Sequence, residues 1–128
     1  MEELREPAGV GVLIVDDQSP FRSVARSLVS TIKGWRVVGE AESGEDAVLA
    51  AARARPDVVL MDINMPGISG LEATRQIVAH DPTVRVVLLS TYAVGDLPAD
   101  ALDCGAIAYV HKEDLSPKLL RESLVAAS

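Results

Sequence analysis

The chain has 128 residues, with 12 Lys and Arg against 19 Asp and Glu, so its formal net charge is −7. Hydrophobic residues make up 48% and charged residues 24%, which is typical of a single globular domain. The acidic balance argues against direct binding to nucleic acid or to an anionic membrane surface, because both require clustered Lys and Arg. The single Cys104 excludes an internal disulfide and indicates a reducing, cytoplasmic setting.

The amino-terminal segment, residues 1–8, is charged and lacks the apolar stretch of a signal peptide. We expect it to form a flexible tail, followed by one domain over residues 9–128. No apolar run approaches the ~20 residues that span a membrane. After the tail, short Val-rich runs alternate with longer amphipathic stretches. This order predicts a parallel sheet covered by helices on both faces.

The first run, Val10–Val15, is apolar almost throughout, as in a strand buried on both faces. Ser19 then predicts an N-cap, and Pro20 the first position of a helix over 20–32. A second, more polar strand is expected at 35–41, and Ser43 caps a helix that runs to residue 54. The later elements are, in order, a strand at 57–62, a helix at 71–80, a strand at 84–89, a short helix at 98–104, a strand at 106–111 and a helix at 117–125 opened by Ser116 and Pro117.

Only a short helix fits between the fourth and fifth strands. Gly95 and Pro98 stand near its start, and Pro is tolerated in the first turn of a helix but not in its interior. We therefore predict a helix over 98–104 that ends at Gly105, with a mobile loop at 92–96 before it.

Polar residues gather where the predicted strands end. In an open parallel sheet, ligands bind at the carboxyl ends of the strands. Those ends carry Asp16, Asp17, Asp62, Ser90 and Lys112. The second strand ends with nothing comparable, only Glu40 and Glu42.

These residue types suit phosphoryl chemistry. Asp16, Asp17 and Asp62 repel one another when brought together, unless a cation joins them or one carboxyl is protonated. Carboxylate oxygens on loops favour Mg²⁺ over zinc or copper. Lys112 adds a positive charge and Ser90 a hydroxyl donor, so together these groups would stabilise a phosphoryl group carried on a carboxylate.

The motifs at these strand ends resemble those of the response-regulator receiver domain of two-component signalling, including chemotaxis regulators. The matching segments are Val15-Asp-Asp17, Leu60-Met-Asp-Ile-Asn-Met-Pro-Gly67, Leu88-Leu-Ser-Thr91 and Tyr109-Val-His-Lys112. The resemblance covers about residues 10–126. It implies a flavodoxin-like, doubly wound α/β fold, with a five-stranded parallel sheet in the order 2-1-3-4-5 and five helices, of which the fourth is short or irregular.

The resemblance also implies roles for single residues. Asp62 would accept a phosphoryl group from the phosphohistidine of a sensor histidine kinase or phosphotransfer protein, or from a small acyl phosphate. Asp16, Asp17 and Asp62 would bind Mg²⁺ together with the backbone carbonyl of Asn64. Beyond this Mg²⁺-dependent phosphorylation and dephosphorylation of Asp62, no enzymatic activity is expected.

Ser90 and Lys112 would contact the phosphoryl group. Tyr109 would be an aromatic switch that turns inward as the Ser90 loop closes, although a half-buried packing aromatic explains it equally well. The change would be read by a downstream output protein or domain at the face formed by the fourth helix, the fifth strand and the last helix. A phosphorylation-dependent dimer is a further possibility.

Two positions depart from the commonest pattern of the family. Glu113 follows Lys112 where many receivers have Pro, so the geometry of that loop is open, and Glu113-Asp114 is similar to receivers joined to helix-turn-helix output domains. Thr91 follows Ser90 where a small residue is frequent, which would restrict access to the site. A receiver-fold interaction module that signals without phosphorylation therefore stays open as an alternative.

A flavodoxin-like or small phosphatase enzyme is the third hypothesis. Aromatic residues are only 3% of the chain, and no phosphate-binding loop is present, which argues against flavin. Asn64 stands where haloacid-type phosphatases place a second Asp. The sequence ends at Ser128, so it represents either a free-standing receiver, for which the initial Met1 argues, or a piece cut before an output domain.

Overall fold

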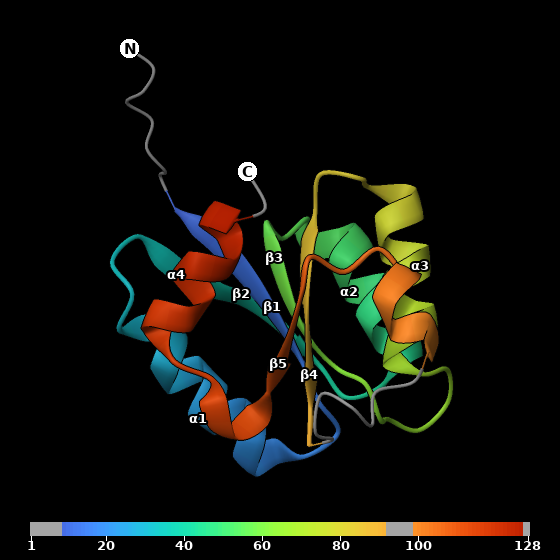
Figure 1. The fold of residues 1–128 in the computed structure, drawn as a ribbon, viewed down its shortest axis with the longest axis horizontal. Helices are drawn as coiled ribbons and strands as arrows, with labels where there is room; N and C mark the ends of the chain where they lie inside the picture. Colours follow the sequence, from blue (N-terminus) through green and yellow to red (C-terminus); the bar gives the residue numbers. More distant parts are fainter. Residues whose placement is uncertain (1–8, 92–98, 127–128) are drawn as a thin grey trace.

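Five parallel strands form one sheet in the order β2-β1-β3-β4-β5 (Figure 1). The computed structural model describes residues 9–91 and 99–126, so the predicted tail at 1–8 and the predicted mobile loop at 92–96 lie outside the described residues. The strands are β1 (Val10–Val15), β2 (Trp35–Ala41), β3 (Val58–Asp62), β4 (Arg85–Ser90) and β5 (Ala108–His111). Every neighbouring pair is parallel, which places all the carboxyl ends at one edge. The predicted flavodoxin-like strand order is confirmed.

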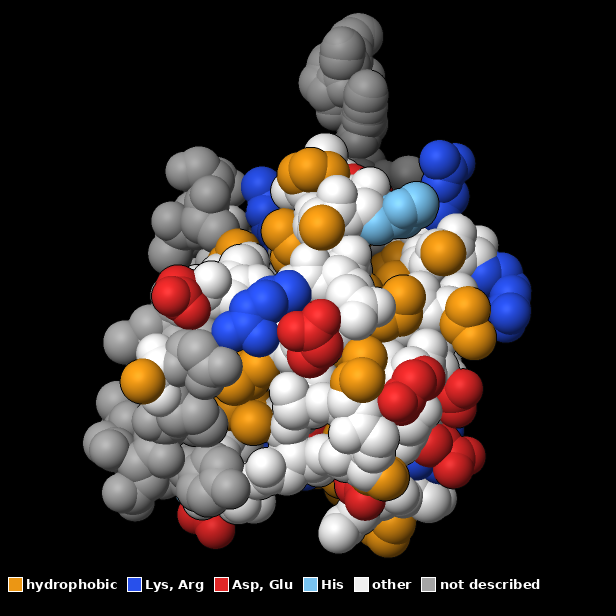
Figure 2. Space-filling model, turned by 90° about the vertical axis from the view of Figure 1, so that its right-hand side faces the viewer, with side chains coloured by type: hydrophobic (Ala, Val, Ile, Leu, Met, Phe, Trp, Pro, Cys, Tyr) orange, Lys and Arg blue, Asp and Glu red, His pale blue; other side chains and the backbone are white. Residues whose placement is uncertain are grey.

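Helices cover both faces of this sheet. Figure 1 shows α1 and α4 on one side and α2 and α3 on the other. Their bounds are α1 (Ser19–Ser30), α2 (Gly44–Ala54), α3 (Gly70–His80) and α4 (Pro117–Ala126). Among the described residues, no helix is long and apolar enough to cross a membrane. The outer surface over α3 mixes hydrophobic side chains with charges of both signs (Figure 2).

The fourth predicted helix is short, as expected, but it is not α-helical. In place of an α-helix over 98–104, the described residues form a 3₁₀ helix, η3 (Ala99–Asp103), so four α-helices rather than five are described. Gly105 follows η3 with a φ of +105°, a conformation that L side chains rarely adopt. Five residues give too little length for a stable α-helical segment, and 3₁₀ geometry is the usual form of such short pieces.

Two hydrophobic clusters, one on each side of the sheet, explain why β1 is apolar throughout. Leu13 and Val15 belong to the cluster shared with α2 and α3. Val12 and Ile14 belong to the cluster shared with α1 and α4. Successive side chains of a strand point to opposite faces, so a strand covered on both sides needs apolar residues at every position.

The predicted helix caps are confirmed at two places and wrong at one. The Ser43 hydroxyl accepts a hydrogen bond from the N–H of Asp46 at 3.1 Å, and the Ser116 hydroxyl accepts one from Leu119 at 3.1 Å. Ser19, however, is the first residue of α1 and not its cap, because Gln18 occupies the N-cap position. The Asp16 carboxylate accepts the N–H of Gln18 at 2.8 Å, so the turn begins one residue earlier than the sequence suggests.

Candidate functional site

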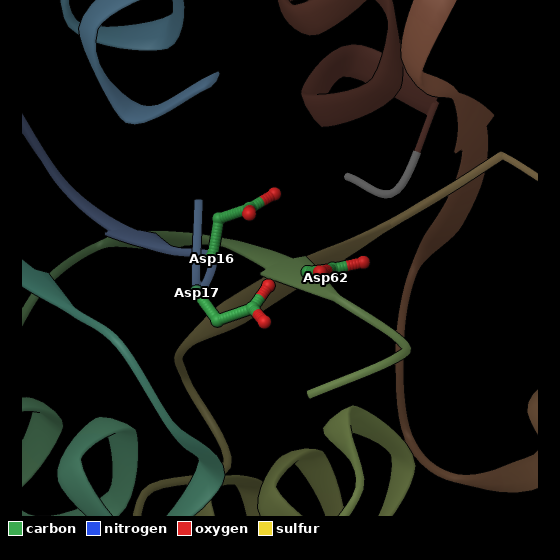
Figure 3. A group of neighbouring side chains, drawn as sticks. All are labelled: Asp16, Asp17 and Asp62. Carbon is green, nitrogen blue, oxygen red and sulfur yellow. The ribbon is translucent and has the colours of Figure 1, made fainter. Parts of the chain in front are cut away.

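Three carboxylates meet at the carboxyl edge of the sheet. Asp16 and Asp17 follow β1, and Asp62 is the last residue of β3, which pairs with β1 in register Val15 to Met61. One oxygen from each carboxylate lies within 4.8 Å of the others. Figure 3 shows the three side chains extending toward the same side of the strand ends. The strand topology thus brings together the residues that the sequence proposed as metal ligands.

The surroundings of Asp62 destabilise its charged form. Asp16 is fully buried and Asp62 nearly so, whereas Asp17 is exposed. Burial and then the charge of Asp16 raise the pKa of Asp62 from 3.8 to about 6, with Asp17 adding a smaller contribution. The ammonium of Lys112 and the N–H of Asn64 oppose this shift. Three carboxylates that repel one another suit a divalent cation that prefers oxygen ligands.

Lys112 places its ammonium beside two of the three carboxylates. Its Nζ lies 2.6 Å from Oδ2 of Asp16 and 3.6 Å from Oδ1 of Asp62. The side chain is only 16% exposed, so these charges interact with little solvent between them. On its other side, the ammonium lies 4.6 Å from the centre of the Phe21 ring. Phe21 in the first turn of α1 is therefore a support for Lys112 that the sequence analysis missed.

We expect Phe21→Leu to lower the free energy of unfolding by about 1 kcal/mol, because leucine fills similar space but offers no π-face to the ammonium. Phe21→Tyr keeps the ring and should stay close to the wild type. Urea unfolding of both variants measures the difference. If Phe21→Leu is as destabilising in a Lys112→Met background as in the wild type, the ring–ammonium contact contributes nothing.

Ser90 and Asn64 also lie next to Asp62. Ser90 is buried at the end of β4, one residue beyond Leu89, which is opposite Asp62 in the sheet. The N–H of Asn64 donates to Oδ1 of Asp62 at 3.3 Å. The roles of the Ser90 hydroxyl and the Asn64 carbonyl stay predictions.

Tyr109 lies half-buried on β5, packed against the cluster shared with α2 and α3. Burial raises the pKa of its phenol, with Cys104 and Asp103 adding to the shift. This position agrees with the packing interpretation of Tyr109, and its role as a switch stays a prediction.

A short 3₁₀ helix, η4 (Lys112–Asp114), forms where the family commonly has Pro after the lysine. Nδ1 of His111 accepts the N–H of Glu113 at 3.2 Å, and Nε2 lies 3.1 Å from the carbonyl oxygen of Thr91. Because Nδ1 accepts, the proton of a neutral ring sits on Nε2 and is donated to Thr91. His111 thus links the two departures from the family pattern, the residue after Ser90 and the residue after Lys112.

The loop between β3 and α3 is held close to Asp62 by residues that the sequence analysis did not single out. A Cβ on Gly70 would overlap the carbonyl oxygen of Asp62, so only glycine permits this approach. The carboxylate of Glu45 accepts the N–H of Ile68 at 3.1 Å from the start of α2. The Glu45 contact joins residues 23 positions apart, and neither contact follows from a spacing pattern in the sequence.

The size of a cavity does not locate this site. A cavity of about 430 Å³ lies between the carboxyl ends of α2 and α3, lined by residues that include Ala51, Ile77 and His80. Its lining shares no residue with the three carboxylates or Lys112. The chemistry of the strand ends, rather than the volume of a cavity, marks the candidate site.

Residues 12–124 match the family model of the response regulator receiver domain. The chain belongs to this family, whose members are the receiver domains of two-component response regulators. Among curated proteins, it is 45% identical over 103 residues to the response regulator UvrY of Escherichia coli (strain K12), which covers 80% of this chain and 47% of that protein. It is 40% identical over 103 residues to the response regulator GacA of Pseudomonas aeruginosa, covering 80% and 48%. The chain therefore spans about half the length of the curated relatives it matches.

Solved structures agree with this assignment. A LuxR-family two-component response regulator from Aurantimonas sp. SI85-9A1 superposes with a TM-score of 0.82 and 30% identity, covering 93% of this chain and 84% of that one. The response regulator domain of Thermotoga maritima CheB gives a TM-score of 0.81 and 32% identity, covering 92% and 96%. The resemblance stated from the sequence motifs is confirmed.

Proposed function

We propose that the chain accepts a phosphoryl group on Asp62 in a reaction that depends on Mg²⁺. The observation that carries this proposal is the meeting of Asp16, Asp17 and Asp62 around the ammonium of Lys112 at the carboxyl edge of the sheet. Membership of the receiver family supports it.

Asp62 is suited to act as the nucleophile. With a pKa of about 6, its carboxylate is mostly ionised at neutral pH and needs no general base. One of its oxygens attacks phosphorus, the P–N bond of a donor phosphohistidine breaks, and its electron pair stays on the donor imidazole. With a small acyl phosphate, the P–O bond to the donor carboxylate breaks instead. The product in both cases is an acyl phosphate on Asp62.

The other residues stabilise charge. A Mg²⁺ ion would be held by Asp16, Asp17 and Asp62 with the carbonyl of Asn64, and it neutralises negative charge on the transferring group when bound. Lys112 already lies 3.6 Å from Oδ1 of Asp62 and offers a positive charge to the phosphoryl oxygens. Ser90 offers the hydroxyl donor at the end of β4.

The partners follow from this chemistry. The phosphoryl donor would be a sensor histidine kinase or a phosphotransfer protein, and an output protein or domain would read the change at the face formed by η3, β5 and α4. A dimer formed on phosphorylation would use the same face. We expect no activity on other substrates, no direct contact with nucleic acid and a cytoplasmic setting.

The test is incubation with acetyl phosphate and Mg²⁺, followed by intact mass. The wild type should gain one phosphoryl group, and Asp62→Asn or the addition of EDTA should abolish the gain. Asp46→Asn, which changes an exposed carboxylate in the first turn of α2, is the matched control and should be labelled like the wild type. Equal labelling of Asp62→Asn would contradict Asp62 as the acceptor, and no labelling of the wild type would favour the phosphorylation-independent module.

A further inference from the structure

The end of β2 is connected to the acidic cluster through one arginine. From the sequence, the second strand ends with only Glu40 and Glu42, and neither has a counterpart in the predicted site. In the structure, the Glu40 carboxylate accepts from Nε of Arg22 at 3.1 Å and from Nε of Arg26 at 2.7 Å. Glu42 lies 3.8 Å from Nη2 of Arg22 and adds a weaker, exposed contact. The Arg22 side chain, only 13% exposed, is thus held at one end of its guanidinium.

The other end of that guanidinium reaches the backbone between Asp16 and Asp17, two of the proposed cation ligands. Nη1 of Arg22 donates to the backbone carbonyl oxygen of Asp16 at 2.7 Å. This carbonyl belongs to the peptide that joins Asp16 to Asp17. The planar guanidinium has donors at fixed directions, so it sets the orientation of the peptide plane it contacts and not only its charge.

The two aspartates depend on this peptide to different degrees. Asp16 is also held through its N–H, which donates to Ala41 at 3.1 Å, and through its carboxylate, which binds Gln18 and Lys112. The Asp17 carboxylate is exposed, and within the described part of the chain it has no hydrogen bond or salt bridge. Its direction toward the other two carboxylates therefore rests on the backbone before it (Figure 3).

We infer that Arg22 is a positioning residue for the divalent cation. Held by Glu40 and Glu42, it fixes the peptide between Asp16 and Asp17 so that the Asp17 carboxylate faces those of Asp16 and Asp62. The inference rests on the proposed cation binding at these three residues. It assigns a role to the end of β2, which contributes no ligand of its own.

Charge and geometry make opposite predictions for this residue. As a positive charge near the site, Arg22 repels a cation, so its removal alone would tighten binding. As a positioning residue, it orients a ligand, and the loss of such supporting contacts typically weakens metal affinity by about tenfold or more. Arg22→Lys keeps the charge and removes the planar fork that joins Glu40 to the Asp16 carbonyl. The lysine variant therefore separates the two effects.

The experiment measures binding of Mn²⁺, an ion that shares the preference of Mg²⁺ for carboxylate oxygens, by electron paramagnetic resonance of the free ion. We expect Arg22→Lys and Arg22→Met to weaken affinity about tenfold. Arg53→Met, which removes an exposed charge from the last turn of α2, is the control and should bind like the wild type. Urea unfolding in EDTA verifies that each variant is folded. Glu40→Gln loosens the same guanidinium without touching Arg22 and should weaken binding by a smaller factor.

A second readout is the Mg²⁺ dependence of labelling by acetyl phosphate. The Mg²⁺ concentration for half-maximal labelling should rise in Arg22→Lys, while the rate at saturating Mg²⁺ returns toward that of the wild type. Unchanged or tighter Mn²⁺ binding in both Arg22→Lys and Glu40→Gln overturns the positioning role of Arg22 but leaves the proposed cation site standing. Absence of Mn²⁺ binding by the wild type overturns the proposed cation site itself.

Discussion

Asp62→Asn is expected to stabilise the cation-free protein at neutral and mildly basic pH and to leave its stability nearly unchanged near pH 4. The pKa of Asp62 is raised from 3.8 to about 6, so the folded state holds this proton more tightly than the unfolded state does. Below a pH of 3.8, the pKa expected in the unfolded state, Asp62 is protonated in both states and does not lower the stability of the folded protein. As the pH rises through about 6, the folded state must ionise a buried carboxyl beside Asp16, and its stability falls.

The size of this effect follows from the shift. One pKa unit corresponds to about 1.4 kcal/mol, and water on the exposed Asp17 side of the cluster screens part of the repulsion, so we expect a gain of about 2 kcal/mol for Asp62→Asn near pH 8. Urea unfolding of both proteins in EDTA, between about pH 4 and about pH 8, gives the difference curve. A difference that stays flat, or grows toward acid, contradicts the raised pKa. Adding Mg²⁺ should stabilise the wild type and leave Asp62→Asn almost unaffected.

Gly70→Ala is expected to destabilise the protein by about 3 kcal/mol, near the upper end of the range for forced steric overlap. The added Cβ would overlap the carbonyl oxygen of Asp62 and press on the backbone of Ile63, and backbone atoms cannot turn aside as a flexible side chain does. The start of α3 or the end of β3 must shift, so labelling of Asp62 should fall as well.

Gly39→Ala is the matched control for this substitution. Its Cβ would lie 3.3 Å from Cδ1 of Leu13, a side-chain atom that can move by a few tenths of an ångström. We expect a change of less than about 1 kcal/mol for Gly39→Ala in thermal or urea unfolding. Equal losses for the two variants would show that the close approach at Gly70 carries no special penalty.

The positions of the acidic residues could be predicted because they follow from local signals. β1 and β3 both show as apolar runs, and a polar residue marks the end of each, as at Asp16 and Asp62. Parallel topology then places those ends at one edge without any knowledge of packing. Lys112 could be assigned to the same edge for the same reason.

The supports of these residues could not be predicted, because they depend on contacts between segments that no spacing relates. Phe21 and Arg22 lie on an amphipathic helix, where their types suggest packing and solvation. Only the packing of α1 against the sheet brings the Phe21 ring to the Lys112 ammonium and the Arg22 guanidinium to the Asp16 carbonyl. Gly70 gives no sign in the sequence of how closely α3 approaches β3. The sequence could predict a short helix before Gly105, but no periodicity in it indicates the 3₁₀ geometry of η3.

The pairing of Lys112 with Asp16 joins residues 96 positions apart in the chain. The lysine directly follows β5, which is an edge strand and the last strand of the sheet in chain order. During synthesis, the three aspartates are therefore all made before the ammonium that partly offsets their repulsion. Until β5 docks, the emerging domain carries an uncompensated cluster of negative charge at its strand ends. The docking of β5 therefore completes the sheet and, in the same step, brings the Lys112 ammonium to the carboxylates of Asp16 and Asp62.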